Sequence, residues 1–189
     1  MKSVKEKVVD RRIKKTKKSL TEALISLILE QGYEKVTVQN IIDRANVGRS
    51  TFYIHYEGKE QLLLDGHNNL NVKMFSDDFD DDQLNNDISF VNLFEHILEN
   101  ERLAKAMLGK QGGNMMTVFF RNSIALKIKK HFKFRFGSSK IEQKLLTYLS
   151  DATGAAIVSL LVSWLEDDMP FTANEMSIKC KMLVTAIFA

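Results

Sequence analysis

Residues 37–59, TVQNIIDRANVGRSTFYIHYEGK, constrain the fold of this chain more than any other stretch. Within them Ile41, Ile42 and Ala45 fall at the spacing of one helix face, which predicts a short helix with one apolar side. Thr37 stands just before that helix, where a threonine oxygen can accept a hydrogen bond from a backbone N–H of the first turn. The sequence therefore predicts that a helix begins directly after Thr37.

A tight turn and a second short helix are expected next. Residues 46–48, Asn-Val-Gly, interrupt the apolar pattern, and asparagine and glycine tolerate a left-handed or strained backbone. The second helix is expected over residues 49–56, with Phe52 and Tyr56 facing inward and polar or basic side chains facing outward. Two short helices joined by such a turn form a helix-turn-helix. In this motif the second helix enters the DNA major groove and its N-terminal residues contact base edges.

The pattern of side chains in this stretch is specific. It consists of Thr37, Val38, Ile41, Ala45, Val47 to Phe52, Tyr53, His55, Tyr56, Lys59 and Leu62. These residues resemble the DNA-binding signature of the TetR (tetracycline repressor) family, and the resemblance covers about residues 12 to 64. Two positions depart from the family pattern, because Asn46 stands where glycine is usual and Tyr56 stands where phenylalanine is usual. Asparagine also accepts a left-handed turn, so the expected fold is unchanged.

The resemblance implies a set of DNA-contacting residues in the helix-turn-helix. They are Thr37, Gln39, Gly48, Arg49, Ser50, Tyr53, His55 and Lys59. We expect Arg49 and Gln39 to contribute most to base recognition. Thr37, Tyr53, His55 and Lys59 are expected to position the protein, and the Ser50 hydroxyl can bond a phosphate. Lys59 opens a further helix, and a helix N-terminus favours an anion such as phosphate. For Arg49 and Lys59 the competing interpretation is an ordinary surface residue, and the family context favours contact.

Composition and charge favour a cytoplasmic all-α protein. One proline, nine glycines and few alternating β-branched runs argue against sheets, and an apolar content of 44% is ample for a core. Cys180 is the single cysteine, so no internal disulfide can form. The sequence contains no run of about 18 apolar residues, so no transmembrane helix is expected. The charged N-terminus does not resemble a secretory signal. Residues 1–20 hold nine Lys or Arg against two acidic residues, beside the helix-turn-helix, as a phosphate-binding surface requires.

The sequence predicts two domains. Residues 1–64 are expected to form a three-helix DNA-binding domain of the helix-turn-helix type, and residues 65–189 a helical domain for effector binding and dimerisation. Within the second domain, Ser139 begins a capping box before a long helix that runs to about Glu166. Thr172 begins another capping box before the last helix. In the family such a pair forms a four-helix interface with its twin, so we expect a homodimer through the last two helices.

An apolar effector pocket in the second domain is also implied by the resemblance. Such sites are mostly apolar with a few polar groups, and methionine and phenylalanine suit an adaptable site. The candidate lining residues are Phe94, Met107, Met116, Phe119, Phe120 and Trp164. The competing interpretation, which is favoured for each of them taken alone, is ordinary core.

Catalytic and metal sites find little support. There is no Gly-rich phosphate loop, HExxH, CxxC or nucleophile elbow, so no enzyme and no cofactor is expected. Carboxylates between Asp77 and Asp82 could bind a divalent cation, but they lack the spacing of a calcium loop, so a solvated loop is favoured. No metal site is therefore predicted.

Two functions remain in view from the sequence. The leading hypothesis is a homodimeric transcriptional regulator, most often a repressor in this family, that binds a pseudo-palindromic operator in double-stranded DNA and responds to a small apolar effector. The alternative is a DNA-localised interaction protein whose C-terminal domain binds a partner protein. A core without a cavity would favour the alternative.

Overall fold

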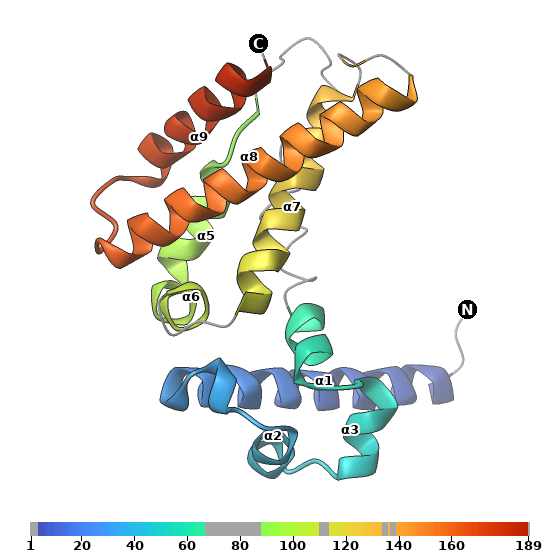
Figure 1. Ribbon diagram of the computed structural model, residues 1–189. Coiled ribbons are helices and arrows are strands. Elements are labelled where there is room, and N and C mark those ends of the chain that lie inside the picture. Colours follow the sequence, from blue (N-terminus) through green and yellow to red (C-terminus); the bar gives the residue numbers. More distant parts are fainter. Residues whose placement is uncertain (1–3, 67–87, 110–113, 134–135, 137–138, 189) are drawn as a thin grey trace. The chain divides into compact units, whose positions relative to one another are not determined.

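The chain is helical in the computed structural model, which describes residues 4–66, 88–109, 114–133, 136 and 139–188 (Figure 1). For residues 4–10 only the backbone is described. No strand occurs in these ranges, so the expected all-α class is confirmed for them. The chain divides into two units, Met1–Leu70 and Asn71–Ala189, which we describe separately.

The N-terminal unit contains the three expected helices and two short helical segments. These are α1 (Val4–Gln31), η1 (Tyr33–Lys35), α2 (Val38–Ala45), α3 (Arg49–His55) and residues 59–66. Gly32 ends α1 with a φ of 79°, a left-handed value that glycine adopts without steric cost. The buried side chains form one apolar centre between the helices. They are Leu20, Leu24, Leu27, Ile28, Tyr33, Val36, Ile41, Ile42, Phe52, Tyr56, Leu62 and Leu63.

The C-terminal unit contains α5 (Val91–Glu99), α6 (Glu101–Leu108), α7 (Asn114–Phe132), α8 (Lys140–Glu166) and α9 (Ala173–Phe188). Both predicted capping boxes are confirmed. The Glu142 N–H donates to the Ser139 hydroxyl over 3.2 Å, and the Glu175 N–H donates to the Thr172 hydroxyl over 3.3 Å. Each cap satisfies backbone donors that have no partner inside the helix. The two long helices therefore begin where the sequence predicts, and Figure 1 shows them running antiparallel.

Close packing of α7 against α8 depends on one small residue. A Cβ atom added at Gly154 would lie 2.8 Å from the Arg121 carbonyl oxygen and 3.2 Å from the Ala125 Cβ. Ordinary side chains do not approach backbone so closely, so glycine allows α7 to come near here.

The start of α5 is set by a distant contact. The Phe90 N–H donates to the buried Ser177 hydroxyl of α9 over 3.0 Å, and α5 begins one residue later.

One helix also meets a composition test for membrane spans. By length and apolar content alone, α8 could cross a membrane, although no unbroken apolar run of that length is present. A core helix of a soluble protein meets the same test, and Ile157, Leu161 and Trp164 of α8 are buried.

Candidate nucleic-acid interface

A reciprocal cap fixes the start of α2. The Asn40 N–H donates to the Thr37 hydroxyl oxygen over 3.1 Å, and the Thr37 N–H donates to the Asn40 side-chain oxygen over 3.0 Å. The expected Thr37 cap is therefore confirmed. Asn40, which the sequence interpretation passed over, takes the role that Glu or Gln usually has at this position. The spacing Thr-x-x-Asn was the available signal.

Asn46 supplies the left-handed residue of the turn, with φ 51° and ψ 50°. Gly48 has φ −64° and ψ 146°, which any residue can adopt. A Cβ at Gly48 would meet only the Thr51 hydroxyl at an ordinary 3.8 Å. The turn conformation therefore depends on Asn46, and glycine at position 48 instead leaves the start of α3 without a side chain.

The outer face of α2 and α3 carries most of the predicted DNA contacts. Exposed side chains or backbone occur at Thr37, Gln39, Gly48, Arg49, Ser50 and Tyr53, whereas His55 and Lys59 are half-buried. Phe52 and Tyr56 are buried on the opposite side, as predicted. Six of the eight candidates are thus accessible, and Gln39 and Arg49 of the two helices are in contact.

Arg49 and Gln39, the two residues predicted to recognise bases, are in direct contact. The Arg49 Nη2 donates to the Gln39 Oε1 over 2.6 Å. The Gln39 Nε2 in turn donates to the Asp43 Oδ1 over 2.7 Å, one helical turn further along α2. The three side chains therefore form a hydrogen-bonded chain from α2 to the first residue of α3.

Ile54 is a further residue on this face that the sequence interpretation missed. Its side chain is 75% exposed near the C-terminal end of α3, between Tyr53 and His55. A large apolar side chain at this exposure is suited to contact with a thymine methyl group or a sugar. The available signal was an isoleucine within the outward-facing part of the motif.

Lys59 has a structural role in addition to the predicted phosphate contact. Its ammonium group lies 2.8 Å from the Val36 carbonyl oxygen, 3.0 Å from that of Tyr33 and 4.3 Å from the centre of the Tyr33 ring. Tyr33 also donates from its hydroxyl to Glu60 over 3.2 Å. These contacts connect residues 59–66 to the segment before α2. The phosphate contact stays a prediction, and it has to share the ammonium group with these carbonyls.

An ion pair holds α2 on α1. The Arg44 guanidinium donates two parallel hydrogen bonds to the Glu30 carboxylate, over 2.7 and 2.8 Å, and a third to the Ser26 hydroxyl. The hydrogen bond from Arg44, with help from Ser26, lowers the pKa of Glu30 from its ordinary value to about 2. A bidentate pair restricts both distance and orientation, so it adds to the burial of Ile41 and Ile42 in placing α2.

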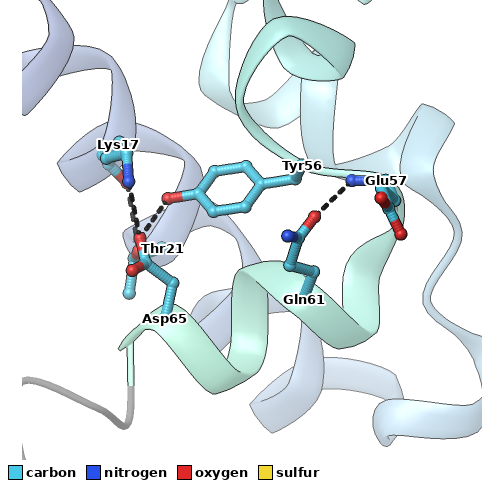
Figure 2. A network of polar contacts seen from close by, with 6 residues as sticks. All are labelled: Lys17, Thr21, Tyr56, Glu57, Gln61 and Asp65. Atoms are coloured by element: carbon cyan, nitrogen blue, oxygen red, sulfur yellow. Dashed lines mark hydrogen bonds and ion pairs between the residues drawn. The ribbon is translucent and has the colours of Figure 1, made fainter.

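A second polar network holds the end of α3 (Figure 2). The Tyr56 hydroxyl donates to the Asp65 carboxylate over 2.7 Å, and the Lys17 ammonium group lies 3.0 Å from the same oxygen. Chiefly the hydrogen bond from Tyr56, supported by Lys17, holds the pKa of Asp65 below its ordinary value despite partial burial. Burial and this hydrogen bond raise the pKa of Tyr56, so its hydroxyl stays protonated and remains a donor. The network joins α1, α3 and residues 59–66.

The predicted effector residues lie in the C-terminal core. Phe94, Met107, Met116, Phe120 and Trp164 are buried, and Phe119 is half-buried. Phe94 and Trp164 pack edge to face with ring centres 5.2 Å apart. A cleft of about 520 Å³ lies between α7, α8 and the end of α6, lined in part by Leu108, Thr117, Arg121, Val158 and Val162. None of the six predicted residues lines this cleft, because size and apolarity also select core positions.

Metal and thiol chemistry have little support in the described ranges. Those residues contain no group of three or more His, Cys, Asp or Glu side chains placed to hold a metal ion. The run from Asp77 to Asp82 lies outside them. Cys180 is buried, and burial raises the pKa of its thiol to about 12, so it remains a neutral thiol near pH 7.

Family models match both units of the chain. The model described as "Bacterial regulatory proteins, tetR family" matches residues 20–65, which include α2 and α3. The model described as "Transcriptional regulator C-terminal region" matches residues 85–186, more than half of the chain. The chain belongs to the TetR family of transcriptional regulators. The resemblance in the sequence is therefore confirmed, and so is a DNA-binding regulator as the class of protein.

Curated relatives of this TetR-family protein align with less than a third of its length. A protein of Bacillus subtilis, the uncharacterized HTH-type transcriptional regulator YxbF, is 42% identical over 60 residues, which is 31% of this chain and 16% of the relative. The probable acrEF/envCD operon repressor of Escherichia coli K12 is 42% identical over 49 residues, 26% of this chain and 22% of the relative. The aligned parts therefore span less than a quarter of these relatives.

Solved TetR-type structures extend the similarity to the whole fold. A TetR transcriptional regulator from Streptococcus agalactiae is 28% identical with a TM-score of 0.68, and the alignment covers 96% of this chain and 98% of the other. NalD, the secondary repressor of the MexAB-OprM efflux pump in Pseudomonas aeruginosa, is 18% identical with a TM-score of 0.52, over 93% and 96% of the two chains. At 18% identity, the similarity to NalD concerns the fold alone. An N-terminal helix-turn-helix followed by a helical C-terminal region is thereby confirmed as the architecture.

Proposed function

We propose that this TetR-family protein is a cytoplasmic homodimeric repressor that binds a pseudo-palindromic operator and is released by a small effector. The observation that carries the proposal is the exposed pair Arg49 and Gln39 on adjoining helices of the DNA-binding unit. The Escherichia coli relative that is named an operon repressor supports repression as the direction of control.

In this proposal α3 enters the major groove with its N-terminal end foremost. Gly48 has no side chain, so DNA can approach the first turn of α3 closely. Arg49 then reaches a base edge, where a guanidinium can bind guanine O6 and N7 with two hydrogen bonds. Ser50, Tyr53 and His55 contact phosphates and set the register of the helix, as do Thr37 and Lys59. Arg49 and Gln39 select the sequence.

Dimerisation through α8 and α9 is supported by exposed apolar side chains on both helices. On α8, Ile141 is 81% exposed, and Leu145 and Tyr148 follow it at helical spacing. On α9, Met182 is 66% exposed and Ile178 lies one turn before it. Contiguous exposed apolar residues of this kind mark interaction surfaces. A second copy covers them in this proposal and spaces two α3 helices about 34–36 Å apart, one turn of DNA.

The cleft between α6, α7 and α8 supports a small-molecule effector as one ligand of the C-terminal unit. Its volume of about 520 Å³ suits a drug-sized ligand, and its lining combines valine and leucine with Arg121 and serine hydroxyls. The lining suggests a ligand with one polar or anionic group. This adds a polar group to the apolar effector that is expected from the sequence. An effector releases DNA only if it binds the released state more tightly than the bound state.

Selection of bound duplexes from a random DNA pool tests the proposed function. Purified full-length protein is incubated with the pool at low and at physiological salt, and bound duplexes are sequenced. The expected result is an enriched inverted repeat at both salt concentrations. Salt-sensitive binding without an enriched motif would contradict the proposal, since non-specific binding is electrostatic and falls steeply with salt.

A further inference from the structure

Three side chains from two helices form one hydrogen-bonded chain beside the predicted base contacts. Asp43 and Gln39 lie one turn apart on α2, and the Gln39 Nε2 donates to the Asp43 Oδ1 over 2.7 Å. Arg49, the first residue of α3, donates from its Nη2 to the Gln39 Oε1 over 2.6 Å. All three residues are exposed, so the chain lies on the surface that meets solvent.

The two ends of this chain dictate how the Gln39 amide is oriented. A carboxylate only accepts hydrogen bonds and a guanidinium only donates them. The amide must therefore turn its NH₂ group towards Asp43 and its oxygen towards Arg49. The opposite orientation would place a donor against Arg49 and an acceptor against Asp43. Asp43 thus determines which group of Gln39 faces α3.

We propose that Asp43 is a positioning residue that sets the base preference of Arg49 through Gln39. The inference rests on the proposed DNA-binding function. One guanidinium N–H donates to Gln39, which restrains the guanidinium and leaves its other donors for two hydrogen bonds to guanine. Once Asp43 is removed, the Gln39 amide is free to rotate. Glutamine can then bind adenine N6 and N7 itself, so adenine is accepted more readily at this position.

The charge of Asp43 makes its positioning role separable from a general effect on affinity. A carboxylate near DNA repels phosphates, so its removal raises sequence-independent binding. A residue that only maintained the fold would instead lower binding to all duplexes. The proposal therefore expects Asp43→Ala to bind mismatched duplexes at least as tightly as the wild type does, while the preference for guanine falls.

The test measures the affinity of the protein for four DNA duplexes by fluorescence anisotropy. They are built on the operator selected by the wild-type protein. Each duplex carries a different base at the operator position that Arg49 is proposed to contact. The wild type is expected to prefer guanine. In Asp43→Ala the ratio of the affinities for the guanine and adenine duplexes is expected to fall roughly tenfold. Glu57→Ala is the matched control, because it removes one exposed acidic group from the same unit and leaves the chain of three residues intact. It should raise affinity without changing the base ratio.

A double-mutant cycle shows whether Asp43 acts through Gln39. With Gln39→Ala in place, the further change Asp43→Ala is expected to leave the base ratio unchanged. Equal thermal unfolding of all variants confirms that each is folded. A guanine preference that survives Asp43→Ala, or independent effects that add in the double variant, would overturn the inference while the proposed function stands. A wild type without any base preference would overturn both.

Discussion

The Tyr56 hydroxyl lies 2.7 Å from the Asp65 carboxylate and donates a hydrogen bond to it, beside Lys17 at 3.0 Å (Figure 2). Tyr56 is the residue that follows α3, and Asp65 lies in residues 59–66. The family usually has phenylalanine at this position, and the structure gives the tyrosine hydroxyl a partner. The recognition helix is thereby joined to the segment that continues towards the rest of the chain.

Tyr56→Phe is expected to loosen this junction while preserving the packing of the ring. A hydrogen bond to a charged group contributes about 1.5–3 kcal/mol, and Asp65 keeps Lys17 as a partner, so a loss of about 1.5 kcal/mol is expected. Hydrogen exchange of amides in residues 50–66, followed by mass spectrometry, measures the change. Tyr53→Phe is the control, because Tyr53 is exposed on the same helix. Equal amide protection in Tyr56→Phe and Tyr53→Phe would contradict the role of the Tyr56 hydroxyl.

Acid should destabilise the DNA-binding unit through Glu30 and Asp65. Both folded-state pKa values lie below the ordinary values of 4.5 and 3.8, and that of Glu30 is about 2. A depressed carboxyl pKa contributes stability above its ordinary value and loses it as pH falls through the folded value. The stability of α2 towards hydrogen exchange is therefore expected to fall between about pH 4.5 and 2. Glu30→Gln should flatten this dependence, and an unchanged slope would contradict the account.

Lys59→Met separates the structural role of this residue from the predicted phosphate contact. The carbonyl oxygens of Tyr33 and Val36 lose a charged donor, so a loss of about 1.5–3 kcal/mol in the N-terminal unit is expected. All DNA sequences should be bound more weakly, with a salt slope smaller by about 1. Unchanged stability would exclude the carbonyl role, and an unchanged slope would exclude the phosphate contact.

Gly154→Ala should strain the contact between α7 and α8. The added Cβ would lie 2.8 Å from the Arg121 carbonyl oxygen, so one helix has to shift, at a cost of about 1–3 kcal/mol. Urea unfolding followed by the fluorescence of Trp164, the single tryptophan, reports on this unit. Ser159→Ala is the control at an exposed position of α8. A gain in stability from the alanine would show that the helices do not pack this closely.

Met182→Glu is expected to weaken the proposed homodimer. A charge would be buried in an apolar interface without a partner, which disfavours association strongly. Sedimentation velocity over a range of protein concentrations should show a larger monomer fraction than in the wild type. Leu126→Glu is the control, since Leu126 is also exposed but lies on α7. Loss of dimer in the control and not in Met182→Glu would place the interface elsewhere.

Local features of the fold could be predicted from the sequence because they depend on neighbouring residues. The Thr37 cap, the Asn46 turn and the inward positions of Phe52 and Tyr56 all follow from spacing within about 20 residues. The Gln39 and Asp43 pair could have been found as well, since residues four apart share one helix face. Its extension to Arg49 depends on how α2 packs beside α3.

Features that depend on distant contacts could not be predicted. The start of α5 follows from the hydrogen bond between Phe90 and Ser177, which lie far apart in the sequence. The carbonyl partners of Lys59 lie before α2 and were equally hidden. The effector residues were chosen for size and apolarity, which describe core and pocket alike, so the cleft near Arg121 was missed.

Methylation protection of guanine N7 on the selected operator tests the central claim most directly, because N7 lies in the major groove. The account predicts one protected guanine in each half-site, about 10–10.5 base pairs apart, with protection lost in Arg49→Ala. A stable complex in which no guanine N7 is protected, or in which Arg49→Ala leaves the pattern unchanged, would contradict recognition by α3 in the major groove.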